Sequence, residues 1–129
     1  YGIVDRETRE MRYVRAGHDL PIHFRPQTGQ LSLLQAPGRF LGSLDGLMLN
    51  EAGFQLMPGD VLVCYSDGLT DAESSPGSRY GLERLKMVVA GVANRSAHSL
   101  AEAIIADVDA FRAGAPQPDD LTLLVMKVQ

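Results

Sequence analysis

Two acidic segments stand where apolar stretches of the chain end or begin, and both could supply metal ligands. Asp67 follows one apolar run, whereas Asp119 and Asp120 precede another. A carboxylate at the end of a strand is rigidly held yet open to solvent, which suits the oxygen ligands of Mg²⁺ or Mn²⁺. Extended geometry turns adjacent side chains to opposite sides, so only one of the last two aspartates is expected to join Asp67. The pattern predicts one shared divalent-cation site.

Taken singly, each acidic segment also has an ordinary structural explanation. Asp67 and Gly68 form an Asp-Gly dipeptide, which is among the commonest turn sequences. Asp119 and Asp120 can protect a sheet edge or cap a turn, although adjacent like charges are costly unless they are solvated or bound to a cation. The metal site is therefore predicted from the two segments jointly, and the turn interpretation stays open for each one alone.

Three histidines are the other candidates for polar chemistry. His18 lies in a tight loop between two expected strands, where it could approach a substrate, although most such histidines are satisfied by backbone groups. His23 and His98 have no evident partner, so we place both on the solvated surface. The sequence has no P-loop, no Gly-x-Gly-x-x-Gly motif and no Ser-His-Asp order, so the motifs that nucleotide binding and acyl transfer require are missing.

Length and charge limit the classes of protein that fit. The 129 residues amount to one domain, and 45% of them are apolar, which is enough to bury a core without disulfide bonds or a structural metal. The net charge of −4 and the pI near 5.2 leave no basic footprint for nucleic acid, and no apolar run approaches a membrane span. The single cysteine, Cys64, cannot form an intramolecular disulfide and favours a reducing compartment, so we expect a cytoplasmic protein.

Periodicity and turn chemistry predict the elements that carry these residues. Alternating segments predict a β meander at the start, and the run 61–65, apolar on both faces, predicts a strand inside a covered sheet. Helical spacing of apolar residues predicts one helix over 81–92 and a second after a cap at Ser96 or Ser99. The expected strands are 1–4, 12–15, 20–24, 31–34, 47–49, 54–56, 61–65 and 121–128.

The order of these elements predicts an α+β sandwich without an internal linker, because strands are followed by two helices and a returning strand. The stretch 73–80 contains Ser-Ser-Pro-Gly-Ser and is predicted to be a loop. Loss of alternation predicts another loop over 38–46. A mobile stretch beside Asp67 could act as a gate for the site.

Six segments together resemble the metal-dependent protein phosphatases (the PPM family), and most closely their bacterial SpoIIE and RsbU-like branch. They match the family in order and approximate spacing over nearly the whole chain, which is far more specific than any one dipeptide. The resemblance implies part of a four-layer α-β-β-α sandwich with mainly antiparallel sheets and two helices near the C-terminus. The segments are Ala16-Gly17-His18, Leu41-Gly42, 56–60, 61–72, 80–85 and 118–123.

The resemblance also implies a chemistry, which is hydrolysis of phosphoserine or phosphothreonine at a binuclear Mn²⁺ or Mg²⁺ centre between two sheets. By motif, Asp67 matches the family's Asp-Gly ligand. Asp119 matches its terminal aspartate ligand, and Asp120 is the weaker candidate of the pair.

The residues that follow Gly68 match the family's switch region, whose position can couple regulation to metal binding. Asp71 or Glu73 is therefore expected to contact metal-held water or a partner protein. His18, in the Ala-Gly-His motif, is a candidate contact for the substrate.

The chain departs from the family pattern at its start. The family's other metal ligands lie in an aspartate pair near Gly-Gly-Asp and in an Asp-x-x-Gly-His-Gly motif, and neither occurs here. Asp67 and Asp119 could hold at most part of one metal's shell. The resemblance therefore predicts that residues 1–129 are a single domain portion, the C-terminal part of a SpoIIE-like phosphatase domain that lacks its N-terminal metal-binding segment and is inactive alone.

Partners follow from the same resemblance. The implied substrate is a phosphorylated STAS-type anti-anti-sigma factor in bacterial regulation, with a sensor or receiver domain upstream. Two other interpretations stay open: a non-catalytic module that binds a regulatory partner, and a small β-rich ligand-binding domain whose acidic corners are mere turns. Missing strands would leave open sheet edges, so a homodimer formed by strand or sheet association is expected.

Overall fold

The computed structural model describes residues 1–38, 40–42, 48–74, 78–117 and 119–129. Most strands precede the helices, and one strand returns at the end. The strands are β1 (Gly2–Val4), β2 (Glu10–Tyr13), β3 (Ile22–Arg25), β4 (Gln30–Leu33), β5 (Ala52–Gln55), β6 (Val61–Tyr65), β7 (Glu73–Ser74), β8 (Ser78–Arg79) and β9 (Leu123–Lys127). The helices are α1 (Asp67–Thr70), α2 (Gly81–Val92) and α3 (Ala97–Arg112).

The larger strands form two sheets, and every pairing between described strands is antiparallel. One sheet has the order β1-β2-β5 and the other has the order β4-β3-β6-β9. The meander expected at the start of the chain takes the form of two hairpins, because β1 pairs with β2 and β3 pairs with β4. The prediction of an α+β protein with mainly antiparallel sheets and a returning last strand is confirmed.

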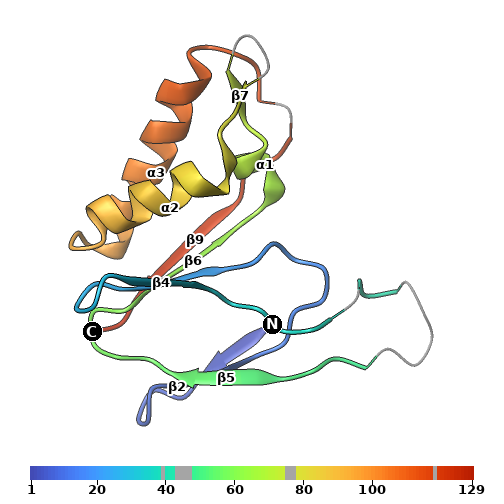
Figure 1. Cartoon of the computed structure of the whole chain (residues 1–129), viewed down its shortest axis with the longest axis vertical. Helices are drawn as coiled ribbons and strands as arrows, with labels where there is room; N and C mark the ends of the chain where they lie inside the picture. The colour runs from blue at the N-terminus through green and yellow to red at the C-terminus, as the bar shows by residue number, and fades with distance from the viewer. Residues whose placement is uncertain (39, 43–47, 75–77, 118) are drawn as a thin grey trace.

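Strand β6 separates two apolar cores, because its side chains alternate between the faces of the four-stranded sheet. Val61, Val63 and Tyr65 are buried in the core that this sheet shares with α2 and α3. Leu62 is buried on the opposite side, in a smaller core that includes Phe54 of the first sheet. Figure 1 accordingly shows α2 and α3 on one side of β6 and β9, and β2 and β5 on the other.

The two long helices follow their predicted patterns. Helix α2 has the expected bounds, and α3 begins after Ser96, whose Oγ accepts a hydrogen bond of 3.2 Å from the backbone N–H of Ser99. The sequence left either serine as the cap, and the structure selects the first. No helix in the described part of the chain has the length and apolar character needed to cross a bilayer.

Two local predictions were wrong. The stretch 73–80 is not simply a loop, because β7 and β8 pair within it, with residues 75–77 outside the described part. Met48 and Leu49 do not form a strand. Strand formation depends on packing against cross-strand and same-face neighbours, so short polar sequences can pair and apolar triplets can stay irregular. Leu47 and much of the predicted loop 38–46 lie outside the described residues.

Candidate metal centre

Asp67 lies at the corner between β6 and α1. Tyr65, the last residue of β6, is buried, whereas Asp67 is exposed as the first residue of α1. Its Oδ1 accepts a hydrogen bond of 2.9 Å from the backbone N–H of Gly68. Its Oδ2 has no hydrogen-bond partner in the described part of the chain, so one carboxylate oxygen stays available to a cation.

The segment that carries Asp119 and Asp120 lies directly against this corner. Ser66 donates its backbone N–H to the carbonyl oxygen of Thr122 at 3.0 Å, and Thr122 donates its own N–H to Ser66 Oγ at 2.9 Å. Ser66 Oγ in turn donates to the carbonyl oxygen of Asp120 at 3.0 Å. Two segments more than fifty residues apart in sequence are therefore joined beside the predicted ligands.

Gly68 allows the closest approach between the two segments. A β-carbon at this position would lie 2.4 Å from the carbonyl oxygen of Asp120 and 3.1 Å from that of Asp119. The carbonyl oxygen of Gly68 also accepts a hydrogen bond of 2.7 Å from Gln117 Nε2. Position 68 therefore needs a glycine, because any side chain there would collide with the backbone of Asp119 and Asp120.

The residues present fit part of a divalent cation's ligand shell. Asp119 is exposed, and its Oδ1 accepts the N–H of Asp120 at 2.7 Å, so it resembles Asp67 in using one oxygen for its own turn. Hard carboxylate oxygens suit Mg²⁺ or Mn²⁺. Within the described ranges, no group of three or more His, Cys, Asp or Glu side chains is placed to hold a metal ion. The aspartates therefore supply a partial shell that needs further ligands.

Asp71 and Glu73, the predicted switch residues, both form ion pairs with Arg79 of β8. Arg79 lies 3.2 Å from Asp71 and 3.9 Å from Glu73, measured from its nitrogens to their carboxylate oxygens. These side chains are between 47% and 65% exposed, so each ion pair stabilises by less than about 1 kcal/mol. These ion pairs therefore add little to the stability of the hairpin.

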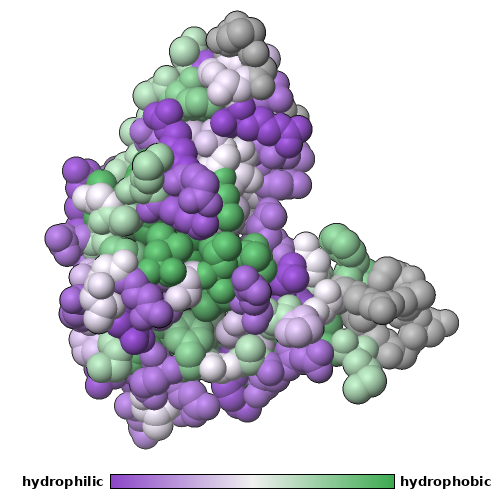
Figure 2. Space-filling model, viewed as in Figure 1, coloured by the Kyte–Doolittle hydropathy of each residue, from purple (hydrophilic) through white to green (hydrophobic). Residues whose placement is uncertain are grey.

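His18 has no described contact with the aspartate corner. Its Nδ1 donates to the carbonyl oxygen of Asp19 at 2.8 Å, and its own carbonyl oxygen accepts from Arg15 at 3.0 Å. The exposed ring instead lines a cavity of about 260 Å³ whose wall includes Tyr13 and Cys64. Figure 2 shows apolar side chains gathered in the middle of one face, between the helices and the first sheet, with hydrophilic residues around them.

His23 does not lie on the solvated surface, contrary to the prediction from sequence. It is buried in β3, where its Nε2 lies 2.8 Å from Asp60 Oδ2. Its ring lies 4.7 Å from the ring of Phe54 in the first sheet. The prediction failed because the partner lies 37 residues away in a Pro-Gly turn, where an aspartate is ordinarily exposed. His98 is exposed, as expected.

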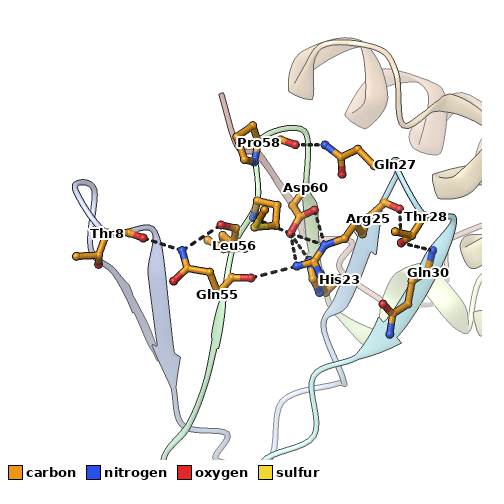
Figure 3. Close-up of polar contacts among 11 residues, drawn as sticks. Thr8, His23, Arg25, Gln27, Thr28, Gln30, Gln55, Leu56, Pro58 and Asp60 are labelled. Carbon is orange, nitrogen blue, oxygen red and sulfur yellow. Dashed lines mark hydrogen bonds and ion pairs between the residues drawn. The ribbon is translucent and has the colours of Figure 1, made fainter.

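Asp60 is fully buried and anchors the junction of the two sheets (Figure 3). It accepts hydrogen bonds from Arg25 Nε at 3.1 Å, from Arg25 Nη2 at 3.0 Å and from the N–H of Met57 at 3.0 Å. Arg25 Nη2 also donates to the carbonyl oxygen of Gln55 in the first sheet at 3.1 Å. Burial would raise the pKa of Asp60, but hydrogen bonds from Arg25, Met57 and His23 outweigh it and hold that pKa below its usual value.

A second polar cluster links α2 and α3 at the end of the β7–β8 hairpin. Asp107 accepts hydrogen bonds of 2.8 Å from Tyr80 Oη and of 2.8 and 3.0 Å from Arg84. The hydrogen bond from Arg84 is the main cause that lowers the pKa of Asp107, and that from Tyr80 adds to it. Burial raises the pKa of the Tyr80 hydroxyl. Phe111 packs edge-on to Tyr80 at 5.5 Å. The sequence indicated the apolar stripes of these helices but not this cluster.

Comparison with known proteins agrees with this architecture. Residues 1–129 match the family model of stage II sporulation protein E (SpoIIE). Protein IcfG of Synechocystis is 27% identical over 131 residues, which cover 98% of this chain and 20% of IcfG. The chain thus spans only a fifth of this relative.

Solved phosphatase domains have the same fold. The SiaA-PP2C domain of Pseudomonas aeruginosa is 22% identical with a TM-score of 0.84, over 97% of this chain and 49% of that domain. The Mn-presoaked phosphatase domain of SpoIIE from Bacillus subtilis is 18% identical with a TM-score of 0.74, over 99% of this chain and 55% of that chain. The chain, which spans about half the length of each of these two chains, shares their fold and belongs to the SpoIIE family.

Proposed function

We propose that this chain supplies the C-terminal part of a protein serine/threonine phosphatase that hydrolyses phosphomonoesters in bacterial regulation. The observation that carries the proposal is the packing of the Asp67 corner against the segment with Asp119 and Asp120. All three carboxylates are exposed, so this arrangement adds nothing to the apolar core. It suits a site that binds a cation between two rigid supports.

Asp67 and Asp119 are the residues that would hold Mn²⁺ or Mg²⁺, with Asp120 as the alternative to Asp119. Such ions, when bound, neutralise charge on the phosphoryl oxygens and lower the pKa of water for in-line attack on phosphorus. The chain's own contribution is to fix the carboxylates. Asp67 lies two residues after β6, which is buried between two cores. The backbone of Asp119 and Asp120 is held beside it through the contacts of Ser66 and Gly68.

The proposed substrate is a phosphorylated STAS-type anti-anti-sigma protein, and the proposed regulator is a sensor or receiver domain upstream. Support comes from membership of the SpoIIE family and from the motif resemblance to its RsbU-like branch. We also propose that residues 1–129 alone have no turnover, because two aspartates complete no metal shell. We also propose a homodimer through sheet edges. Leu124, on the edge strand β9, is 58% exposed, which fits this association.

Manganese titration tests the metal site directly. Mn²⁺ added to ¹⁵N-labelled chain is expected to broaden the amide signals of residues 66–71 and 119–122 by paramagnetic relaxation. Asp67→Asn and Asp119→Asn should remove this broadening, whereas Asp109→Asn, which changes an exposed carboxylate on α3, should leave it intact. Broadening that persists in both corner variants would show that the metal site is elsewhere.

Phosphatase assays test the activity. A phosphoserine peptide should be hydrolysed in the presence of Mn²⁺ by a chain extended at its N-terminus with the family's remaining ligand motifs, and not by residues 1–129 alone. Asp67→Asn in the extended chain should abolish turnover, and Asp109→Asn should preserve it. Turnover that survives Asp67→Asn would contradict the proposal.

A non-catalytic module that binds a regulatory partner is the second candidate function. It is favoured by the observation that, in the part of the chain the structure describes, no third His, Cys, Asp or Glu side chain completes a metal site with the aspartates. An extended chain that carries every family ligand motif, binds a STAS-type protein and yet hydrolyses no phosphoserine would favour this module over the enzyme.

A further inference from the structure

We propose that Ser66 and Gln117 are positioning residues that set the separation between Asp67 and the segment carrying Asp119. Neither side chain is a metal ligand in this proposal, because each acts through hydrogen bonds to backbone groups of the opposite segment. The inference rests on the proposed function, since the separation matters only if the two aspartates act on one cation.

Ser66 occupies the N-cap position of α1, yet its hydroxyl makes no hydrogen bond to that helix. A serine at this position ordinarily accepts the N–H of the second or third helical residue. Its Oγ instead accepts from Thr122 at 2.9 Å and donates to Asp120 at 3.0 Å. Ser96, the N-cap of α3, shows the ordinary arrangement, because its Oγ accepts from Ser99. The Ser66 hydroxyl therefore serves the junction between the acidic segments.

Gln117 lies just before the second acidic segment and bonds to the corner that carries Asp67. Its Nε2 donates to the carbonyl oxygen of Gly68 at 2.7 Å, and it stands two residues before Asp119. Its Oε1 is buried and has no hydrogen-bond partner among the described residues. The contact that the described residues give this side chain is therefore its bond to Gly68.

The two contacts act on both neighbours of Asp67. Ser66 precedes Asp67 and Gly68 follows it, and both are bonded to the 117–122 segment. Contacts on two sides constrain the rotation of the corner as well as its distance. Metal ligands need to be held within about 0.5 Å of their working geometry, and outer partners that orient them commonly contribute 10- to 100-fold in metal affinity.

Variants of these two residues test the proposal through Mn²⁺ affinity, measured by the paramagnetic broadening of amide signals. Ser66→Ala and Gln117→Ala are each expected to weaken Mn²⁺ affinity by roughly 10-fold. Ser66→Thr should restore it, because threonine keeps the hydroxyl and favours the extended backbone found there, with φ −86° and ψ 160°. Hydrogen exchange without metal should show faster exchange of the Thr122 amide in Ser66→Ala.

Matched controls separate positioning from general stability. Ser96→Ala removes an ordinary cap serine, and Gln27→Ala removes an exposed glutamine whose Nε2 donates to the carbonyl oxygen of Pro58. Both should leave Mn²⁺ affinity and Thr122 exchange unchanged. Wild-type affinity in Ser66→Ala and Gln117→Ala would overturn the inference while leaving the proposed function intact. Failure of a chain extended at its N-terminus with the family's remaining ligand motifs to bind Mn²⁺ at all would overturn the proposed function, and the inference with it.

Discussion

Gly68 and Asp120 are in backbone contact across the aspartate junction, so close that a β-carbon on the glycine would lie 2.4 Å from the aspartate's carbonyl oxygen. The atoms that a side chain at position 68 would meet belong to the main chain, and hydrogen bonds of Ser66 with Asp120 and Thr122 hold that main chain in place. A flexible side chain could move aside, but these carbonyl groups cannot do so without separating the two acidic segments.

Replacement of Gly68 by alanine should therefore destabilise the protein by about 1–3 kcal/mol, the usual cost of overpacking, and should also weaken Mn²⁺ binding. Urea unfolding measures the first effect and paramagnetic broadening the second. Gly91→Ala is the control, because Gly91 is exposed in α2 and a β-carbon there meets nothing within 4 Å. Alanine at Gly91 should stabilise the helix by about 0.5–1 kcal/mol. Equal effects at both glycines would contradict the steric argument.

Loss of the buried Asp60 charge should be among the most damaging single changes. Asp60→Asn leaves Arg25 without its ionic partner and turns amide hydrogens toward groups that already donate, so we expect a loss of about 3 kcal/mol. Glu51→Gln, which removes a surface pair with Arg12 at 3.5 Å, should cost less than about 1 kcal/mol. Urea denaturation of both variants checks the contrast, and a mild effect of Asp60→Asn would contradict the role assigned to this carboxylate.

Two carboxyl groups that are paired inside the fold contribute to the acid limb of the stability curve. The pKa values of Asp60 and Asp107 lie below their usual 3.8 in the folded protein. Their contribution is therefore present above about pH 4 and is lost as the pH falls through the folded values, since the unfolded chain takes up protons first. The free-energy difference between wild type and Asp60→Asn should accordingly shrink as the pH falls below about 4. A difference that stays constant over this range would refute the assignment.

The Tyr80 hydroxyl should contribute measurably to the packing of α2 against α3. Tyr80→Phe keeps the edge-on contact with Phe111 but loses the 2.8 Å hydrogen bond to Asp107, so a loss of about 1 kcal/mol is expected. Tyr1→Phe is the control, because Tyr1 is 87% exposed. Thermal unfolding compares the two, and equal melting temperatures for both variants would argue against a structural role for the hydroxyl.

Local sequence determined the elements whose pattern is strong over several residues. The run 61–65 is a strand with the predicted bounds, and 81–92 is a helix with the predicted bounds, because burial on two faces or on one stripe dictates their composition. The position of Asp67 at the end of β6 followed directly. The SpoIIE-like family could also be predicted, since its motifs are short, local and ordered along the chain.

Only the tertiary structure decided which distant polar groups meet. The burial of His23 depends on Asp60, and Ser66 is bonded to residues beyond position 119. None of these pairings leaves a periodic signal, because a hydrogen bond between remote residues constrains two side chains and not the composition around them. Sequence thus predicted that Asp67 follows strand β6, and folding determined which contacts hold the backbone of Asp119 and Asp120 against that corner.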